Sequence, residues 1–228
     1  MRHRAFAALC LSLAAAPLTA QQPRDFGPYL IADRAAEIAL ARTAAPANVS
    51  DSATVLVMTR TGFVEAAHGT NGFTCAVFRS FAAPSNNPNV WNSKIRAPQC
   101  FNAAAVRSVL PAMLKRMEWI LAGTTPAEAD VRTERDYASH QFPSPESGAM
   151  AYMLSRDQYL NDTHPNWMPH VMFYYDKSLP GSALGALDDG AAPIIDGSAD
   201  DPHAAILTVF IPVRRWSDGS TALPPAGH

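Results

Sequence analysis

Residues 53–80, ATVLVMTRTGFVEAAHGTNGFTCAVFRS, contain three short apolar runs separated by two turn sequences. The runs cover residues 53–59, 63–67 and 73–80, and they are rich in the β-branched and aromatic residues typical of strands. Arg60-Thr61-Gly62 and Asn71-Gly72 lie between them, and both are typical of tight turns. We therefore expect an antiparallel meander in which each strand pairs with the next along the chain.

Helices are expected between this meander and a second group of strands. Residues 103–121 repeat apolar side chains at helical spacing, although Pro111 should kink the helix. Thr125 and Glu128 form a capping box that opens another helix, to about residue 139. Further strands are expected at residues 148–155, 170–176 and 205–216.

This order of elements predicts the fold class. Strands at both ends with helices between them do not alternate as βαβ units would. The sequence therefore predicts an α+β fold with a single antiparallel sheet of five or six strands and helices packed on one face.

The N-terminus has the layout of a secretory signal peptide. Arg2 and Arg4 precede the apolar stretch 5–16, and residues 17–20 (PLTA) end in a small residue. We expect cleavage after Ala20, which leaves residues 21–228 as a single α+β domain. The mature protein is then periplasmic or secreted and does not span a membrane, because no second long apolar run exists.

The charge balance argues against nucleic acid as a partner. The chain has 18 basic and 20 acidic side chains, a formal charge of −2, and loss of Arg2 and Arg4 changes this to −4. A nucleic-acid interface needs a clustered basic face, which a weakly acidic domain does not favour.

Cys75 and Cys100 are the two cysteines that remain after cleavage. In an oxidising compartment such a pair is expected to form a disulfide. A redox or metal pair is the alternative, but the chain has no Cys-x-x-Cys motif.

Thioethers and imidazoles gather between residues 150 and 172. His164, Met168, His170 and Met172 are the candidate ligands of a copper or zinc ion, because soft sulfur ligands favour Cu(I) in an exported protein. Core packing is the alternative role of these methionines, and no spacing among them is diagnostic of a metal site.

Aromatic residues in the same region suggest a groove for a ligand. Tyr152, Trp167 and Tyr174 are the candidate lining residues, and His170, Met172 and Tyr174 should share one face of a strand. A serine hydrolase is a third interpretation, with Ser147, His170 and either Asp176 or Asp218 as the candidate triad, but no Gly-x-Ser-x-Gly sequence is present.

Six short segments resemble those of a group of exported bacterial proteins of unknown function. The segments are Asn71–Cys75 (NGFTC), Ala97–Asn102 (APQCFN), Gly148–Met153 (GAMAYM), Pro169–Tyr174 (PHVMFY), Phe210–Val213 (FIPV) and Trp216–Gly219 (WSDG). The resemblance covers most of the mature chain and implies a single secreted domain. It implies no activity, cofactor or substrate.

These observations favour an exported module that binds a small molecule or an envelope component, or that has a structural role there. The first alternative is an exported metal-binding protein or metal-dependent enzyme centred on His164 and His170.

Overall fold

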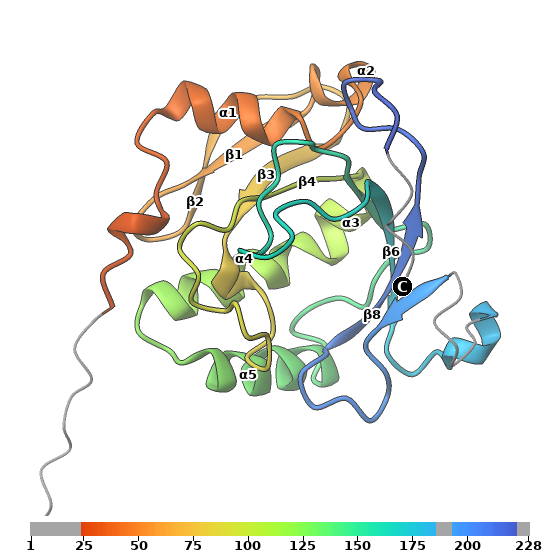
Figure 1. The fold of residues 1–228 in the computed structure, drawn as a ribbon. Helices are drawn as coiled ribbons and strands as arrows, with labels where there is room; N and C mark the ends of the chain where they lie inside the picture. Colours follow the sequence, from red (N-terminus) through yellow and green to blue (C-terminus); the bar gives the residue numbers. More distant parts are fainter. Residues whose placement is uncertain (1–23, 186–192, 223–228) are drawn as a thin grey trace, which may run out of the picture.

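The structure, a computed structural model, describes residues 24–185 and 193–222 and is built around one eight-stranded sheet (Figure 1). The strands are β1 (Thr54–Met58), β2 (Phe63–Ala67), β3 (Thr74–Phe78), β4 (Ala97–Phe101), β5 (Met150–Met153), β6 (His170–Asp176), β7 (Ile194–Asp196) and β8 (Ile206–Pro212). Their order across the sheet is β2-β1-β3-β4-β5-β6-β8-β7. The expected signal peptide, residues 1–20, lies outside the described residues.

The sheet is mixed, so the expected antiparallel sheet of five or six strands was wrong. β1 and β3 run parallel, with Val55 beside Cys75, and every other neighbouring pair is antiparallel. The cause lies in the connection from β2 to β3, where the backbone of Gly69 crosses the start of β1. Gly69 N donates to Thr54 Oγ1 (3.0 Å), and a Cβ on Gly69 would lie 2.1 Å from the backbone nitrogen of Thr54. The chain therefore enters the sheet on the far side of β1, and Asn71-Gly72 does not close a hairpin.

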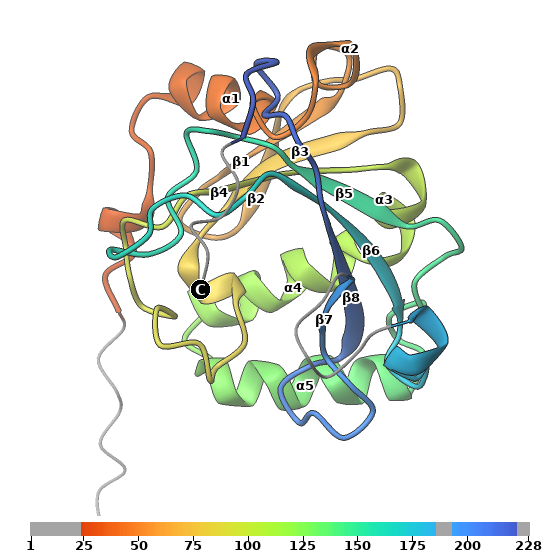
Figure 2. The same ribbon diagram turned by 45° about the vertical axis from the view of Figure 1, so that its right-hand side comes forward.

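Helices cover both faces of the sheet, which corrects the expectation of one covered face (Figures 1 and 2). The helices are α1 (Arg34–Arg42), α2 (Ala47–Ser50), α3 (Ala103–Ser108), α4 (Leu110–Leu121) and α5 (Pro126–Ala138), with 3₁₀ turns η1 (Gly27–Tyr29), η2 (Ser80–Ala82) and η3 (Gly181–Leu184). Ala41 of α1 packs with Val55 and Val77 on one face. Met117 of α4 packs with Phe78 on the other, which we call the inner face. No helix of the described residues is both long and apolar enough to cross a membrane.

Local signals explain where the inner-face helices begin. The Asn102 side chain accepts from Ala105 N and so caps α3, while the turn at Val109 separates α3 from α4. Pro111 therefore lies in the first turn of α4, where its missing N–H has no partner to lose. The capping box of Thr125 and Glu128 at the start of α5 is confirmed.

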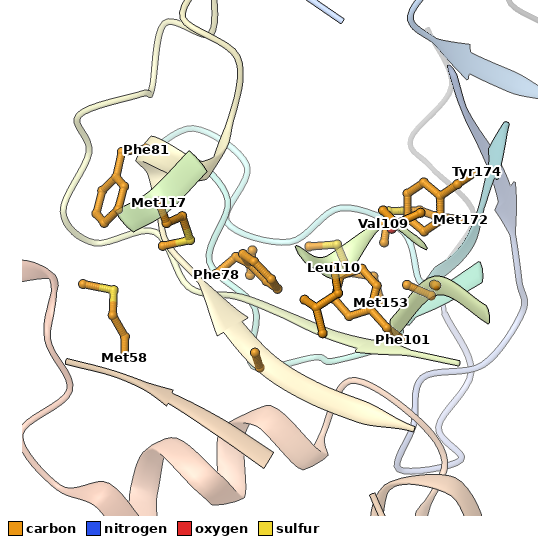
Figure 3. Close-up of a cluster of buried hydrophobic side chains, with 14 of the residues drawn as sticks. Met58, Phe78, Phe81, Phe101, Val109, Leu110, Met117, Met153, Met172 and Tyr174 are labelled. Carbon is orange, nitrogen blue, oxygen red and sulfur yellow. The ribbon is translucent and has the colours of Figure 1, made fainter. Parts of the chain in front are cut away.

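The inner face carries the larger of the two apolar clusters. Phe78 and Phe101 of the sheet meet Leu110 and Met117 of α4, and Met172 lies in the same cluster (Figure 3). Adjacent strand residues alternate between faces, so Val77 belongs to the opposite cluster although it is also fully buried.

The disulfide between Cys75 and Cys100 is present. It joins Cys75 of β3 to Cys100 of β4, which are directly opposite each other in the antiparallel β3–β4 pair. The bond closes a segment with a sequence separation of 25 residues, for which chain entropy gives a stabilisation of about 3 kcal/mol.

Candidate functional site

A cavity of about 450 Å³ lies on the inner face of the sheet. Strands β3, β4, β5, β6 and β8 form its floor, helices α4 and α5 form one wall, and residues 82–87 form another. Its volume falls within the range of sites that hold small organic molecules.

Strand alternation makes most of the lining apolar. Along β6, His170, Met172 and Tyr174 share one face, as the sequence predicted, and the structure buries them on the inner face. Met172 pairs with Phe210 of β8, so Phe210 also lies on this face, and Met113 of α4 lines the cavity as well. The cavity therefore offers a ligand mainly methyl groups, thioethers and aromatic rings.

His170 is the most informative polar residue of this site. Its side chain is 1% exposed and contacts Trp167 and Phe210, whose ring centroids lie 4.6 and 5.4 Å away. Nδ1 lies 2.8 Å from the carbonyl oxygen of Met168. Because a carbonyl only accepts, Nδ1 carries the proton and Nε2 carries the lone pair. Burial lowers the pKa of His170, so the ring is neutral at pH 7.

Nε2 of His170 has no protein partner, although it is buried. Five buried side-chain polar atoms in the described residues lack a partner, and three of them belong to residues that line this cavity: Ser80, Gln99 and His170. Gln99 reaches the inner face because β4 pairs it with Ala76 of β3. Unpartnered polar atoms are unusual in folded proteins, and their concentration here indicates a site for a polar contact from outside the chain.

Two buried ion pairs also border the cavity. Arg79 lies 2.7 Å from Glu37, and Arg116 lies 2.8 Å from Asp130. Desolvation lowers the pKa of each guanidinium, and the neighbouring carboxylate opposes that shift. Each arginine also donates to backbone carbonyl groups, such as that of Tyr29 for Arg79. Both positive charges at the cavity are therefore compensated within the protein.

The end of the cavity near α5 is more polar and partly exposed. Nδ1 of His203 lies 3.3 Å from Asp130 Oδ2, which also accepts from the backbone N–H of Ser85. Burial raises the pKa of Asp196 here, and Asp201 adds to that shift. At this end of the cavity, the contact of His203 with Asp130 links residues 201–205 to α5.

The predicted metal ligands separate in the structure. His164 is exposed and does not line the cavity, whereas His170 and Met172 do. Met168 contributes its carbonyl group to His170, and its side chain is not part of the lining. Within residues 24–185 and 193–222, no three histidine, cysteine, aspartate or glutamate side chains are placed to hold a metal ion.

The predicted groove residues also divide between the two faces. Trp167 and Tyr174 line the cavity, but Tyr152 lies on the opposite face and stacks on Phe73 with ring centroids 6.2 Å apart. Gln99 was not predicted, because a lone glutamine beside a proline gives no signal of its own in the sequence.

Hydrolase geometry is not present around His170. Its Nδ1 faces a carbonyl group and not a carboxylate, and Ser147 is exposed and outside the cavity lining. A nucleophile and an orienting acid are both needed for the serine mechanism.

Comparisons of the chain with protein-family models, with curated proteins and with solved structures found no match. The cavity and its unpartnered polar atoms therefore carry the functional argument.

The buried imidazole of His170 predicts a loss of stability in mild acid. In the unfolded chain it takes up a proton near pH 6.5, whereas the folded protein resists protonation because its pKa is lowered. The unfolded state thus binds more protons below pH 6.5, and the free energy of unfolding should fall as pH falls, by up to about 1.4 kcal/mol per pH unit. Urea unfolding between pH 7.5 and 5 measures this slope.

Two variants assign that slope to His170. His170→Gln should reduce it, because glutamine does not titrate, while the matched variant of the exposed His164, His164→Gln, should leave it as in the wild type. An unchanged slope in His170→Gln would contradict the assignment.

Proposed function

We propose that the protein is an exported binding protein that holds a small, mainly apolar molecule in the inner-face cavity. The observation that carries this proposal is a cavity of about 450 Å³ with mainly apolar walls, lined in part by His170, whose buried Nε2 has no partner in the protein. A buried acceptor without a partner costs folding free energy, which a bound ligand can recover.

Export is part of the proposal and is supported by the sequence of residues 1–20 and by the disulfide. Disulfides persist in oxidising compartments such as the periplasm and the extracellular space. The resemblance to a group of exported bacterial proteins agrees with this location. The natural ligand is then a small molecule or an envelope component.

A neutral fluorescent probe tests the binding proposal. N-phenyl-1-naphthylamine emits strongly only in apolar surroundings, so we expect saturable fluorescence on titration of the wild-type protein. Thr208 lies on the inner face of β8 beside Tyr174, and Thr208→Trp should fill part of the cavity. The affinity of this variant should fall about tenfold or more, equivalent to at least about 1.4 kcal/mol.

Ile211→Trp is the matched control. Ile211 lies on the same strand, but it is 38% exposed and outside the cavity lining. This variant should bind the probe as the wild type does, and thermal melting checks that both variants fold. Equal binding by all three proteins would place the probe elsewhere, and no binding to the wild type would refute the proposal.

Metal binding is the alternative to an organic ligand, and it can be tested on the same protein. Of the four predicted ligands only His170 and Met172 line the cavity, so the geometry favours an organic ligand. Equilibration with Cu(I) or Zn²⁺ followed by elemental analysis separates the two cases. One metal ion per protein that disappears in His170→Ala would support the metal site instead.

A further inference from the structure

We infer that the ligand is neutral and presents a hydroxyl or amine hydrogen to Nε2 of His170. This inference rests on the proposed binding function and adds the chemistry of the ligand's polar end. The side chain of His170 is 99% buried, and Nε2 has only a lone pair to offer. A group that accepts hydrogen bonds, such as an ether or a ketone, gains nothing from that atom.

The second unpartnered atom of the sheet points to the same chemistry. Gln99 Oε1 is also an acceptor. The β4–β5 ladder pairs Cys100 with Tyr152, and β5 pairs Met153 with His170, so one strand separates Gln99 from His170. At the usual strand spacing their backbones are about 10 Å apart. The inner face thus offers two acceptor positions across an apolar floor.

The charges around the cavity disfavour an anionic ligand. Arg79 and Arg116 are the cationic side chains among the described lining residues, and each already pairs with a buried carboxylate. A ligand carboxylate would leave water without gaining a free cation, and such a transfer is unfavourable. Asp196 adds an acid to the lining and would repel an anion further.

The surroundings of His170 make the hydrogen bond selective. Trp167 and Phe210 contact the imidazole, with centroids 4.6 and 5.4 Å from its own, and keep it in an apolar environment. A hydrogen bond is stronger there than in water, and a ligand that lacks the donor leaves the acceptor unpaired.

Three naphthalene probes of one ring size test the inference: 2-naphthol, 2-methoxynaphthalene and 2-naphthoate. We expect 2-naphthol to bind tightest by calorimetry, and the other two to bind ten- to a hundredfold more weakly, equivalent to about 1.4 to 2.8 kcal/mol. Equal affinity for 2-naphthol and 2-methoxynaphthalene, or tighter binding of 2-naphthoate, would overturn the inference.

Two variants of His170 assign the preference to one atom. Asparagine places its amide nitrogen near the position of Nδ1, so His170→Asn can keep a donor toward the Met168 carbonyl while removing the acceptor at Nε2. Glutamine is one bond longer, and His170→Gln can return an oxygen near the Nε2 position. We expect His170→Asn to lose the preference for 2-naphthol and His170→Gln to keep part of it.

The probe without a hydrogen-bond donor, 2-methoxynaphthalene, distinguishes binding in the cavity from the hydrogen bond to His170. Unchanged affinity for 2-methoxynaphthalene in both variants shows that the cavity is intact, so a change confined to 2-naphthol reports the hydrogen bond. A preference that survives in His170→Asn would refute the inference while leaving the binding function in place. Failure of all three probes and of N-phenyl-1-naphthylamine to bind the wild type would refute the binding function itself.

Discussion

Gly69→Ala is expected to destabilise the protein by at least about 4 kcal/mol, which is the range of exceptional single substitutions. A Cβ at this position would lie 2.1 Å from Thr54 N, 2.3 Å from the carbonyl carbon of Ala53 and 2.6 Å from Ser52 O. All three are backbone atoms, so no side-chain rotation relieves the overlap. The crossing segments are also tied together, because Thr70 N donates to Ser52 O (2.8 Å).

Gly27→Ala is the matched control for this substitution. The nearest atom to a Cβ on Gly27 is Oδ1 of Asp25, 3.1 Å away, on a side chain that is 78% exposed and accepts a hydrogen bond from Gly27 N (2.8 Å). We expect a change within about 1 kcal/mol in either direction. Urea unfolding followed by circular dichroism compares the two variants, and near-wild-type stability of Gly69→Ala would contradict the crossing described for β1.

Arg79→Met is expected to cost about 3–5 kcal/mol of unfolding free energy, the usual result of breaking a buried ion pair. Its guanidinium is fully buried and pairs with Glu37, whose side chain is 2% exposed. The substitution leaves that carboxylate without its cation, and it removes the donors that Arg79 directs at the carbonyl groups of Tyr29 and Val77. The loss therefore reaches η1, β3 and α1 together.

A double-mutant cycle tests whether the effect belongs to the pair. Glu37→Leu combined with Arg79→Met should cost less than the sum of the two single substitutions, by about 0.5–3 kcal/mol. Arg107→Met is the control, because Arg107 pairs with Glu146 on the surface and should contribute less than about 1 kcal/mol. Additive losses in the cycle would show that the burial of Arg79, and not the pairing, determines the effect.

The sequence predicted local elements better than their arrangement. The three strands in residues 53–80 and the capping box before α5 were predicted correctly. The meander was wrong because a turn sequence indicates that the chain reverses but does not say on which side of β1 it returns. That choice depends on the contact of Gly69 with Thr54, which no local pattern shows.

β4 was missed for a different reason. No strand was expected at residues 97–101, since proline is unusual inside a strand. Pro98 nevertheless pairs with Val77 of β3, while the described pairing with β5 is confined to Cys100 and Phe101. Pro98 is tolerated in β4 because β5 does not pair with it. No hydrogen bond between β4 and β5 therefore requires the N–H that proline lacks.

The sequence predicted which residues of a single strand share a face of the candidate site. It did not predict which residues from different strands and helices meet there. Period-two alternation placed His170 and Tyr174 on one face, and both line the cavity. Tyr152 was grouped with them by closeness in sequence, but the β5 register places it on the opposite face. Gln99 and the ion pair of Arg116 with Asp130 reach the cavity from distant segments, and only the folded chain brings them together.

The two outermost strands of the sheet have a consequence for self-association. An open edge offers backbone groups on which another chain can add a strand, and this is a common route to aggregation. β7 is only three residues long, and in β2 the carbonyl group of Glu65 already accepts a hydrogen bond from Arg34 (3.1 Å). Neither edge strand therefore presents a long row of free backbone groups. A second copy of the protein could extend the sheet beyond β2 only if the guanidinium of Arg34 first left the carbonyl group of Glu65.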